Sequence, residues 1–367
     1  MTGRTLPDAA GTLAYLLAEQ SPRYAGRTSN EAERLRGDVL ASFEKAGLPP
    51  DAVPFVLEEL ETGRNPSTVA AAGRALRGAT TIPVEAPELL VAAIARLRGS
   101  DDVVSLDGFA TATASPNGGA NSGAVTALTD LAATLAVLGP RAKRAIPTLQ
   151  VLLDGGGYSN SVRTELGRAL NAMIRSESTV DSCCCAEDST EMAAPPLGPA
   201  SPAAIRTELG DVEVENQDGV RLTFAEALAG RTSALAFFYT RCMNPEKCSL
   251  TVTRLGRLAR LVTESGLDAN VAGMSYDPRF DRPGRLRTYG ADRGMVFSSR
   301  CSLLRTCGPF DPITDAFALG VGFGPVTVNR HRLDLVVLDA SLDVAQTFER
   351  RLWHEDTVLE ALRAARS

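Results

Sequence analysis

The sequence predicts a protein of two domains, an all-helical domain followed by an α/β domain. In the first 175 residues, apolar side chains recur at three- and four-residue spacing, which is the period of packed helices. From residue 206 onward, short apolar runs alternate with helical patterns, as in α/β domains. All seven cysteines lie after residue 182, so the two halves also differ in their chemistry.

Composition and charge narrow the range of functions. A chain of 367 residues is long enough for two cores, and 44% hydrophobic with 22% charged residues is typical of globular proteins. The net charge is −6 and basic residues are scattered, which argues against a nucleic acid or an anionic membrane surface as partner. No apolar run reaches the ~18–20 residues of a membrane span. The N-terminus carries Asp8 and no small-residue cleavage site, so we expect a cytoplasmic protein.

The helical domain, residues 1–175, contains an internal similarity. The segment 54–76 resembles 147–170, an offset of about two helical hairpins of ~40–47 residues each. Intervening helices are expected over 87–97 and 124–138, with a loop over 111–123, and the run 138–156 resembles a HEAT-type repeat. Such arrays present a curved surface to a protein or peptide partner. The alternative is a helical cap that only stabilises the second domain.

Residues 176–205 read as a linker, because they are rich in Ser, Ala, Pro and acidic residues without a helix or strand period. Within them stand three adjacent thiols, Cys183, Cys184 and Cys185, flanked by acidic residues. Neighbouring thiolates are soft donors that suit Cu(I). We therefore expect them to bind metal, with a chance cluster in a linker as the alternative.

The last part, residues 206–367, predicts an α/β domain. In order, the pattern predicts a hairpin over 211–224, a buried strand over 233–240, a helix from 250, a strand over 270–277, a helix over 282–289, a strand over 333–340 and a helix from 354. Cys242 follows the first buried strand, and Cys248 precedes the helix that comes next. This order places thiols at a helix N-terminus, where the helix dipole favours thiolate.

Three segments of this domain resemble the Sco (SenC) family. They are the strand end FFYTRC with Cys242 and the later Cys248, the motif GMSYDPRFDRPGRLRTY over 273–289, and His331 ahead of LVVLD. The resemblance implies a thioredoxin-like fold that binds copper through two Cys and one His, here Cys242, Cys248 and His331. It also implies a role in copper delivery or thiol reduction for cytochrome oxidase assembly. Asp277 would be a nearby acidic residue and not a ligand.

The chain departs from that family in its cysteines. The family spaces its pair C-x-x-x-C, whereas five residues separate Cys242 from Cys248. On one helix, a six-residue offset would place the thiols ~120° apart, so Cys242 is expected on the preceding loop. Cys301 and Cys307 form a second pair with the same spacing. We expect them to line the same opening of the domain as the first pair, which predicts more than one copper per chain. The alternative is that both are buried structural thiols.

Three functions follow from these residues. The first is a cytoplasmic protein that binds Cu(I) or Cu(II) for delivery or storage. The second is a copper-dependent oxidoreductase that acts on a small molecule or a peptide. The third is a copper-free thiol–disulfide oxidoreductase that uses Cys242 and Cys248 as catalytic thiols.

The remaining expectations concern the setting of the two histidines and a glycine-rich run. His331 is expected on a loop with little packing. His354 is expected at the surface or as a helix cap. The glycines Gly320, Gly322 and Gly324 lack a following helix, so a dinucleotide site is not expected.

The first testable prediction concerns the predicted linker. Limited proteolysis of the folded protein should cut first within 176–202 and leave two folded fragments, because exposed segments without packed side chains are the preferred sites of cleavage. Mass spectrometry of the early fragments locates the cut. Resistance of 176–202 while other sites are cut would contradict the proposed boundary.

Overall fold

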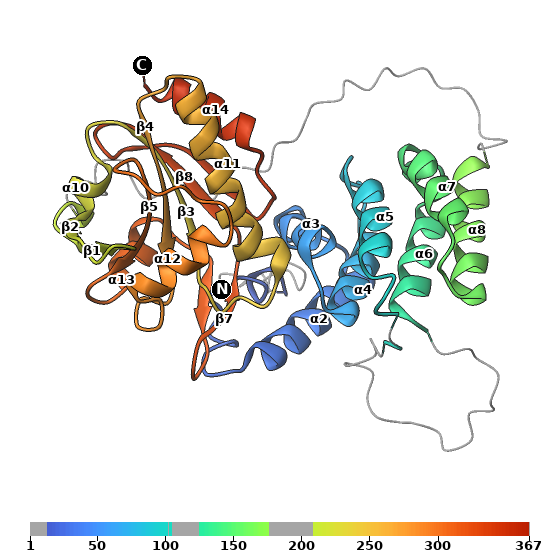
Figure 1. Ribbon diagram of the computed structural model, residues 1–367. Coiled ribbons are helices and arrows are strands. Elements are labelled where there is room, and N and C mark those ends of the chain that lie inside the picture. The colour runs from blue at the N-terminus through green and yellow to red at the C-terminus, as the bar shows by residue number, and fades with distance from the viewer. Residues whose placement is uncertain (1–12, 102, 105–124, 176–207, 367) are drawn as a thin grey trace, which may run out of the picture. The chain divides into compact units, whose positions relative to one another are not determined.

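The computed structural model describes residues 13–101, 103–104, 125–175 and 208–366 (Figure 1). The chain divides into two compact units. One comprises residues up to 18 and 30–194, and the other comprises Glu19–Ser29 together with 195–367. The expected loop over 111–123, the expected linker over 176–205 and its three cysteines lie outside the described residues.

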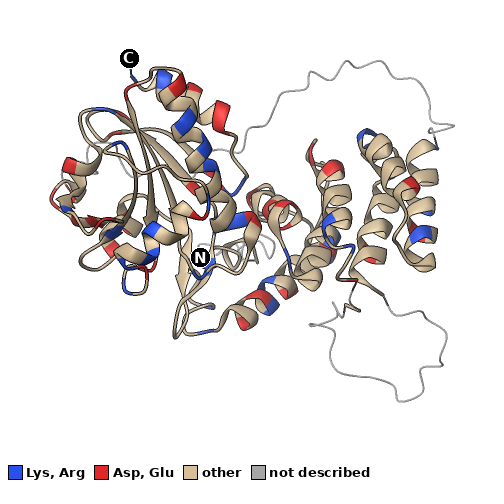
Figure 2. Cartoon of the chain, in the orientation of Figure 1, with Lys and Arg blue, Asp and Glu red and all other residues tan. Residues whose placement is uncertain are grey.

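The first unit is helical, as the sequence predicts. Its helices are α2 (Ser29–Ala46), α3 (Val53–Thr62), α4 (Pro66–Ala75), α5 (Ala86–Arg96), α6 (Ala127–Leu138), α7 (Ile146–Gly155) and α8 (Asn160–Ile174). Several begin at side-chain caps, for example at Asn65, Thr126 and Ser159, each of which accepts a hydrogen bond from a backbone N–H three residues on. Figure 2 shows both signs of charge on these helices. The HEAT-type assignment stays a prediction.

The second unit is built on a mixed seven-stranded sheet of order β2-β1-β5-β4-β3-β8-β9. The strands are β1 (Glu213–Asn216), β2 (Arg221–Thr223), β3 (Thr232–Phe238), β4 (Ala269–Ser275), β5 (Cys301–Thr306), β8 (Asp334–Leu338) and β9 (Val344–Glu349). β3, β4 and β5 run parallel, and β8 runs antiparallel to β3. The predicted hairpin over 211–224 is confirmed as β1 and β2.

Both faces of the central strands are covered, which is why β3 and β4 are buried along their whole length. On one face, α11 (Leu250–Glu264) and α14 (Glu355–Ala364) pack together over β3 (Figure 1). Successive side chains of a strand alternate between faces. Phe238 accordingly stacks on Tyr289 of α12 (Pro283–Ala291), while Phe237 meets Phe317 beyond α13 (Asp311–Ala316).

Two strands stand outside this sheet. β6 (Val321–Phe323) and β7 (Val328–His331) form an antiparallel hairpin of their own. His331 is therefore the last residue of a strand and not part of a loop. β5 is a second element absent from the sequence-based expectation. None of the helices in the described part of the chain has the length and hydropathy needed to cross a membrane.

Candidate metal centre

Cys242 and Cys248 are placed by the turn that follows β3. The strand ends at Phe238, and Cys242 lies on the loop beyond it, as the six-residue offset predicts. Cys248 lies in a wide helical turn, η4 (Pro245–Ser249), directly before α11. The side chain of Asn244 opens that turn by accepting a hydrogen bond from the backbone N–H of Glu246 at 2.9 Å. Cys248 thus stands at the positive end of a 15-residue helix.

His331 completes a group of three donors. Its Nε2 lies 3.4 Å from the Sγ of Cys242 and 3.5 Å from the Sγ of Cys248. The three candidate ligand atoms all lie within 4.8 Å of one another. The other ring nitrogen, Nδ1, lies 3.0 Å from the carbonyl oxygen of Arg332, which can only accept. Nδ1 therefore donates to this carbonyl, and Nε2 faces both thiols.

The expectation that His331 carries little packing is wrong. Its side chain is only 6% exposed. The imidazole and the ring of Tyr239 are nearly perpendicular, with centroids 5.4 Å apart, and the ring of Tyr276 lies 5.7 Å from the imidazole between centroids. A buried strand position between two aromatic rings fixes the orientation of the imidazole before any ligand arrives.

The pKa values of the two thiols are shifted in opposite directions. A hydrogen bond from Cys248 and the nearby His331 lower the pKa of Cys242 well below its usual value, against the opposing effect of burial. Burial raises the pKa of Cys248 well above the usual value, and the neighbouring Cys242 raises it further. Of the two thiols, Cys242 therefore gives up its proton more readily, and Cys248 donates the hydrogen bond between them.

The motif over 273–289 fixes the loop before Cys242. Asp281 is fully buried and accepts hydrogen bonds from the backbone N–H of Thr240 at 3.0 Å and from the hydroxyl of Ser275 at 2.5 Å. Asp277 binds the guanidinium of Arg241 through its Oδ2, at 3.1 Å from Nε. The carboxylate of Asp277 is therefore already paired with Arg241, beside the thiols.

Cys301 and Cys307 do not join this group. Cys301 opens β5 and pairs with Val271 in the first half of β4, whereas Cys242 follows the far end of β3. Because the three strands are parallel, Cys301 lies toward the opposite end of the sheet from Cys242. Cys307 follows the other end of β5, about 20 Å from Cys301 along a strand of this length. One ion cannot bridge these two thiols.

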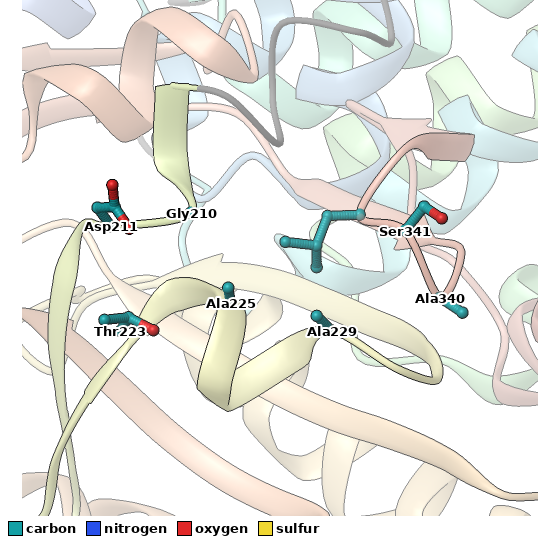
Figure 3. A pocket seen from close by; sticks show the side chains of 8 residues that line it. Gly210, Asp211, Thr223, Ala225, Ala229, Ala340 and Ser341 are labelled. Atoms are coloured by element: carbon teal, nitrogen blue, oxygen red, sulfur yellow. The ribbon is translucent and has the colours of Figure 1, made fainter.

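The other candidates lie elsewhere. His354 occupies the exposed N-cap position of α14, where its side chain makes no capping hydrogen bond. A cavity of about 280 Å³ is lined by Gly210, Thr223, Ala229 and Leu342 among others. Figure 3 labels seven of its lining residues. Residue 229 precedes β3, so the cavity lies at the opposite end of that strand from Cys242.

One contributor was not singled out from the sequence. The ammonium of Lys247 is buried and donates to the backbone carbonyl of His331 at 2.9 Å. It ties the thiol loop to the strand that carries the imidazole. In the sequence, only the position of this lysine next to Cys248 could have indicated a role at the site. A lysine next to a cysteine normally predicts a solvent-exposed side chain.

Fold and site together define the class: an α/β domain of thioredoxin-like type that carries a Cys-Cys-His group. Comparison with family models then matches residues 206–301 to SCO1/SenC, which supports the resemblance of this part of the chain to the Sco/SenC family. The match contains Cys242 and Cys248 and ends before His331. No curated protein matches the chain.

Solved structures are similar over less than half of this chain. A putative electron transfer protein from Aquifex aeolicus is 20% identical with a TM-score of 0.38, over 43% of this chain and 90% of its own. A SCO1/SenC family lipoprotein from Bacillus anthracis is 19% identical with a TM-score of 0.38, over 42% and 92%. Copper-bound ScoI from Arabidopsis thaliana is 18% identical with a TM-score of 0.35, over 42% and 96%.

The thiol environments predict a difference in reactivity. In the metal-free reduced protein at pH 7, iodoacetamide should modify Cys242 much faster than Cys301, because the thiolate is the reacting form and burial raises the pKa of Cys301 to about 11. Mass spectrometry of each cysteine peptide over time measures both rates. The same peptides from unfolded protein are the control and should react alike. Equal rates in the folded protein would contradict the assigned environments.

Proposed function

We propose that this chain binds copper through Cys242, Cys248 and His331 and holds Cu(I) for delivery to a partner. The observation that carries the proposal is the convergence of two thiols and one imidazole within 4.8 Å. Two sulfur donors and one nitrogen suit Cu(I), which is soft and accepts low coordination numbers. The cytoplasmic address stays a prediction.

The protonation of the site supports the same proposal. The lowered pKa of Cys242 favours a thiolate before the metal arrives, whereas the raised pKa of Cys248 means that this thiol gives up its proton on metal binding. Nε2 of His331 already lies 3.4 and 3.5 Å from the two sulfurs. The chain therefore holds the three donor atoms close to the arrangement in which they would bind the metal.

Delivery is favoured over storage by the unequal exposure of the donors. Cys248 and His331 are buried, whereas Cys242 is half-buried on a loop next to Met243, whose side chain is 93% exposed. A ligand from a partner protein can approach the ion on the Cys242 side and replace that sulfur first. A storage site would be expected to cover all of its donors.

Thiol–disulfide exchange is a second candidate, and the low pKa of Cys242 beside a second thiol favours it. In this reaction the Cys242 thiolate attacks a partner disulfide and releases one partner thiolate. The Cys248 thiolate then attacks the sulfur of Cys242 and releases the second partner thiol. The pair ends as a disulfide, and two electrons have passed to the partner. The cavity in Figure 3 lies away from the thiols and so does not support a small-molecule oxidoreductase.

Replacement of the donors tests the copper proposal. Cys248→Ser and His331→Phe should each weaken Cu(I) binding at least tenfold, or about 1.4 kcal/mol. Phenylalanine keeps a ring between Tyr239 and Tyr276 and removes the donor nitrogen. Competition with a chromophoric Cu(I) chelator measures the affinity. Cys301→Ser is the matched control, since it changes another buried thiol of the same core and should leave the affinity unchanged. Wild-type affinity in both ligand variants would refute the proposed site.

The number of ions separates this site from the other thiols. The sequence-based expectation of four thiolates at one mouth predicts a loss of copper in a Cys301→Ser/Cys307→Ser variant. The proposed site predicts no loss, because neither thiol is among the three donors that lie within 4.8 Å of one another. A separate variant, in which Cys183, Cys184 and Cys185 are all changed to Ser, measures how much copper these three residues bind. Metal analysis after anaerobic loading gives each ratio, and a fall in the Cys301/Cys307 variant would return those residues to the site.

A further inference from the structure

We propose that Glu19–Ser29, which we call the strap, is a positioning element of the metal centre. The strap holds the β6–β7 hairpin, and the hairpin presents His331. The effect on copper rests on the proposed function above, whereas the contact between strap and hairpin does not. The inference begins from the assignment of these eleven residues of the N-terminal region to the same compact unit as the Cys-Cys-His group.

The hairpin needs support from outside. β6 and β7 pair only with each other among the described strands and do not join the seven-stranded sheet. An isolated two-stranded hairpin is marginally stable in water. His331 pairs with Val321 at the end of this hairpin. The position of the imidazole relative to the thiols therefore depends on what packs against β6 and β7.

The strap binds β7 through one buried side chain. The amide of Asn329 donates two hydrogen bonds, to the backbone carbonyls of Tyr24 and Arg27, each at 2.9 Å. Asn329 is 7% exposed and lies two residues before His331. The strap residue Tyr24 is itself buried at 1% exposure. Both donors of one amide thus fasten the histidine strand to a segment about 300 residues earlier in the chain.

The strap also lies directly on β6, where glycines allow the close approach. A Cβ at Gly322 would lie 2.5 Å from the carbonyl oxygen of Glu19, and one at Gly324 would lie 2.6 Å from that of Arg27. Any larger residue would push the strap away. The amide of Gln20 donates to the carbonyl of Leu319, just before β6, at 2.9 Å. These contacts account for two glycines of the GVGFG run.

An ion pair anchors the start of the strap. Both carboxylate oxygens of Glu19 accept from the guanidinium of Arg350 at 2.8 Å, and both residues are buried. Bidentate pairs of this kind fix geometry as well as adding energy. Arg350 also has a left-handed φ of 63°, a conformation that is costly for a residue with a side chain. The pair thus joins the strap to the residue that follows β9.

Two variants loosen the strap without touching a donor. Asn329→Asp keeps the shape of the side chain but removes both N–H donors, and Gly322→Ala places a Cβ against Glu19. Each has a matched control in the same unit. Asn270→Asp alters another buried Asn whose amide donates to a backbone carbonyl, that of Leu228 at 3.2 Å near the start of β3. Gly308→Ala adds a Cβ where no atom lies within 4 Å.

Cu(I) affinity of the full chain is the first readout. Asn329→Asp and Gly322→Ala should each weaken binding about tenfold, as loss of residues that orient a ligand typically does. Both controls should bind as wild type does. In a His331→Phe background, Asn329→Asp should cause no further loss, because it acts through the imidazole. A purely structural effect would add to the His331 effect, and additivity would overturn the proposal.

Hydrogen exchange of the metal-free protein is the second readout, and it does not depend on copper. Amides of 19–29 and 328–331 should exchange faster in Asn329→Asp and Gly322→Ala than in wild type or the controls. Unchanged exchange would show that the strap does not hold the hairpin. Faster exchange with wild-type copper affinity would show that the strap does not position His331. If wild type binds no copper while exchange rises as expected, the proposed function fails and the contact stands.

Discussion

The proposed metal centre depends on bringing one imidazole to two thiols that the chain places without it. Cys242 and Cys248 are set by a single turn between β3 and α11, so local structure determines their positions. His331 comes 83 residues after Cys248 and from a hairpin outside the main sheet. A ligand set functions only when its members are held to within about 0.5 Å. The contacts that fix the hairpin, those of Lys247 and the strap included, are therefore part of the site.

The sequence predicts the elements whose signal is local. The turn at Asp218-Gly219, the apolar run before Cys242 and the amphipathic helix after Cys248 each show their period within a few residues, and each appears in the structure. The three donors were likewise found by their place in short motifs. What these motifs could not give is the burial of His331, since NRHRLD is too polar to read as an interior strand.

The strands that the sequence analysis missed contain polar residues whose partners lie far along the chain. β5 contains Arg305, which argues against a buried strand, yet it is 8% exposed because its guanidinium pairs with Glu215 of β1. In β7, Asn329 is satisfied by carbonyls of the strap. The strap itself contains Pro, Gly and Ser and reads as an ordinary connection before a helix. No periodicity in one segment can reveal a hydrogen-bond partner about 300 residues away.

The charges around the site suggest why a monovalent ion suits it. Ion pairs join Arg332 to Asp334 and Glu349, and Arg350 to Glu19, while Lys247 binds the carbonyl of His331. These carboxylates offset the charges of the two arginines, and the two thiols add the charge of the centre itself. Without metal, one thiolate and one thiol carry a single negative charge.

Cu(I) with two thiolates carries the same charge, because the ion enters as one proton leaves. A divalent ion would change that charge by one unit inside a buried site, where uncompensated changes are costly. Two metal-free thiolates would double it, which agrees with the raised pKa of Cys248. The proposed exchange of a proton for Cu(I) thus leaves the charge of the two sulfurs as it was, and the imidazole of His331 supplies the third donor of the proposed site.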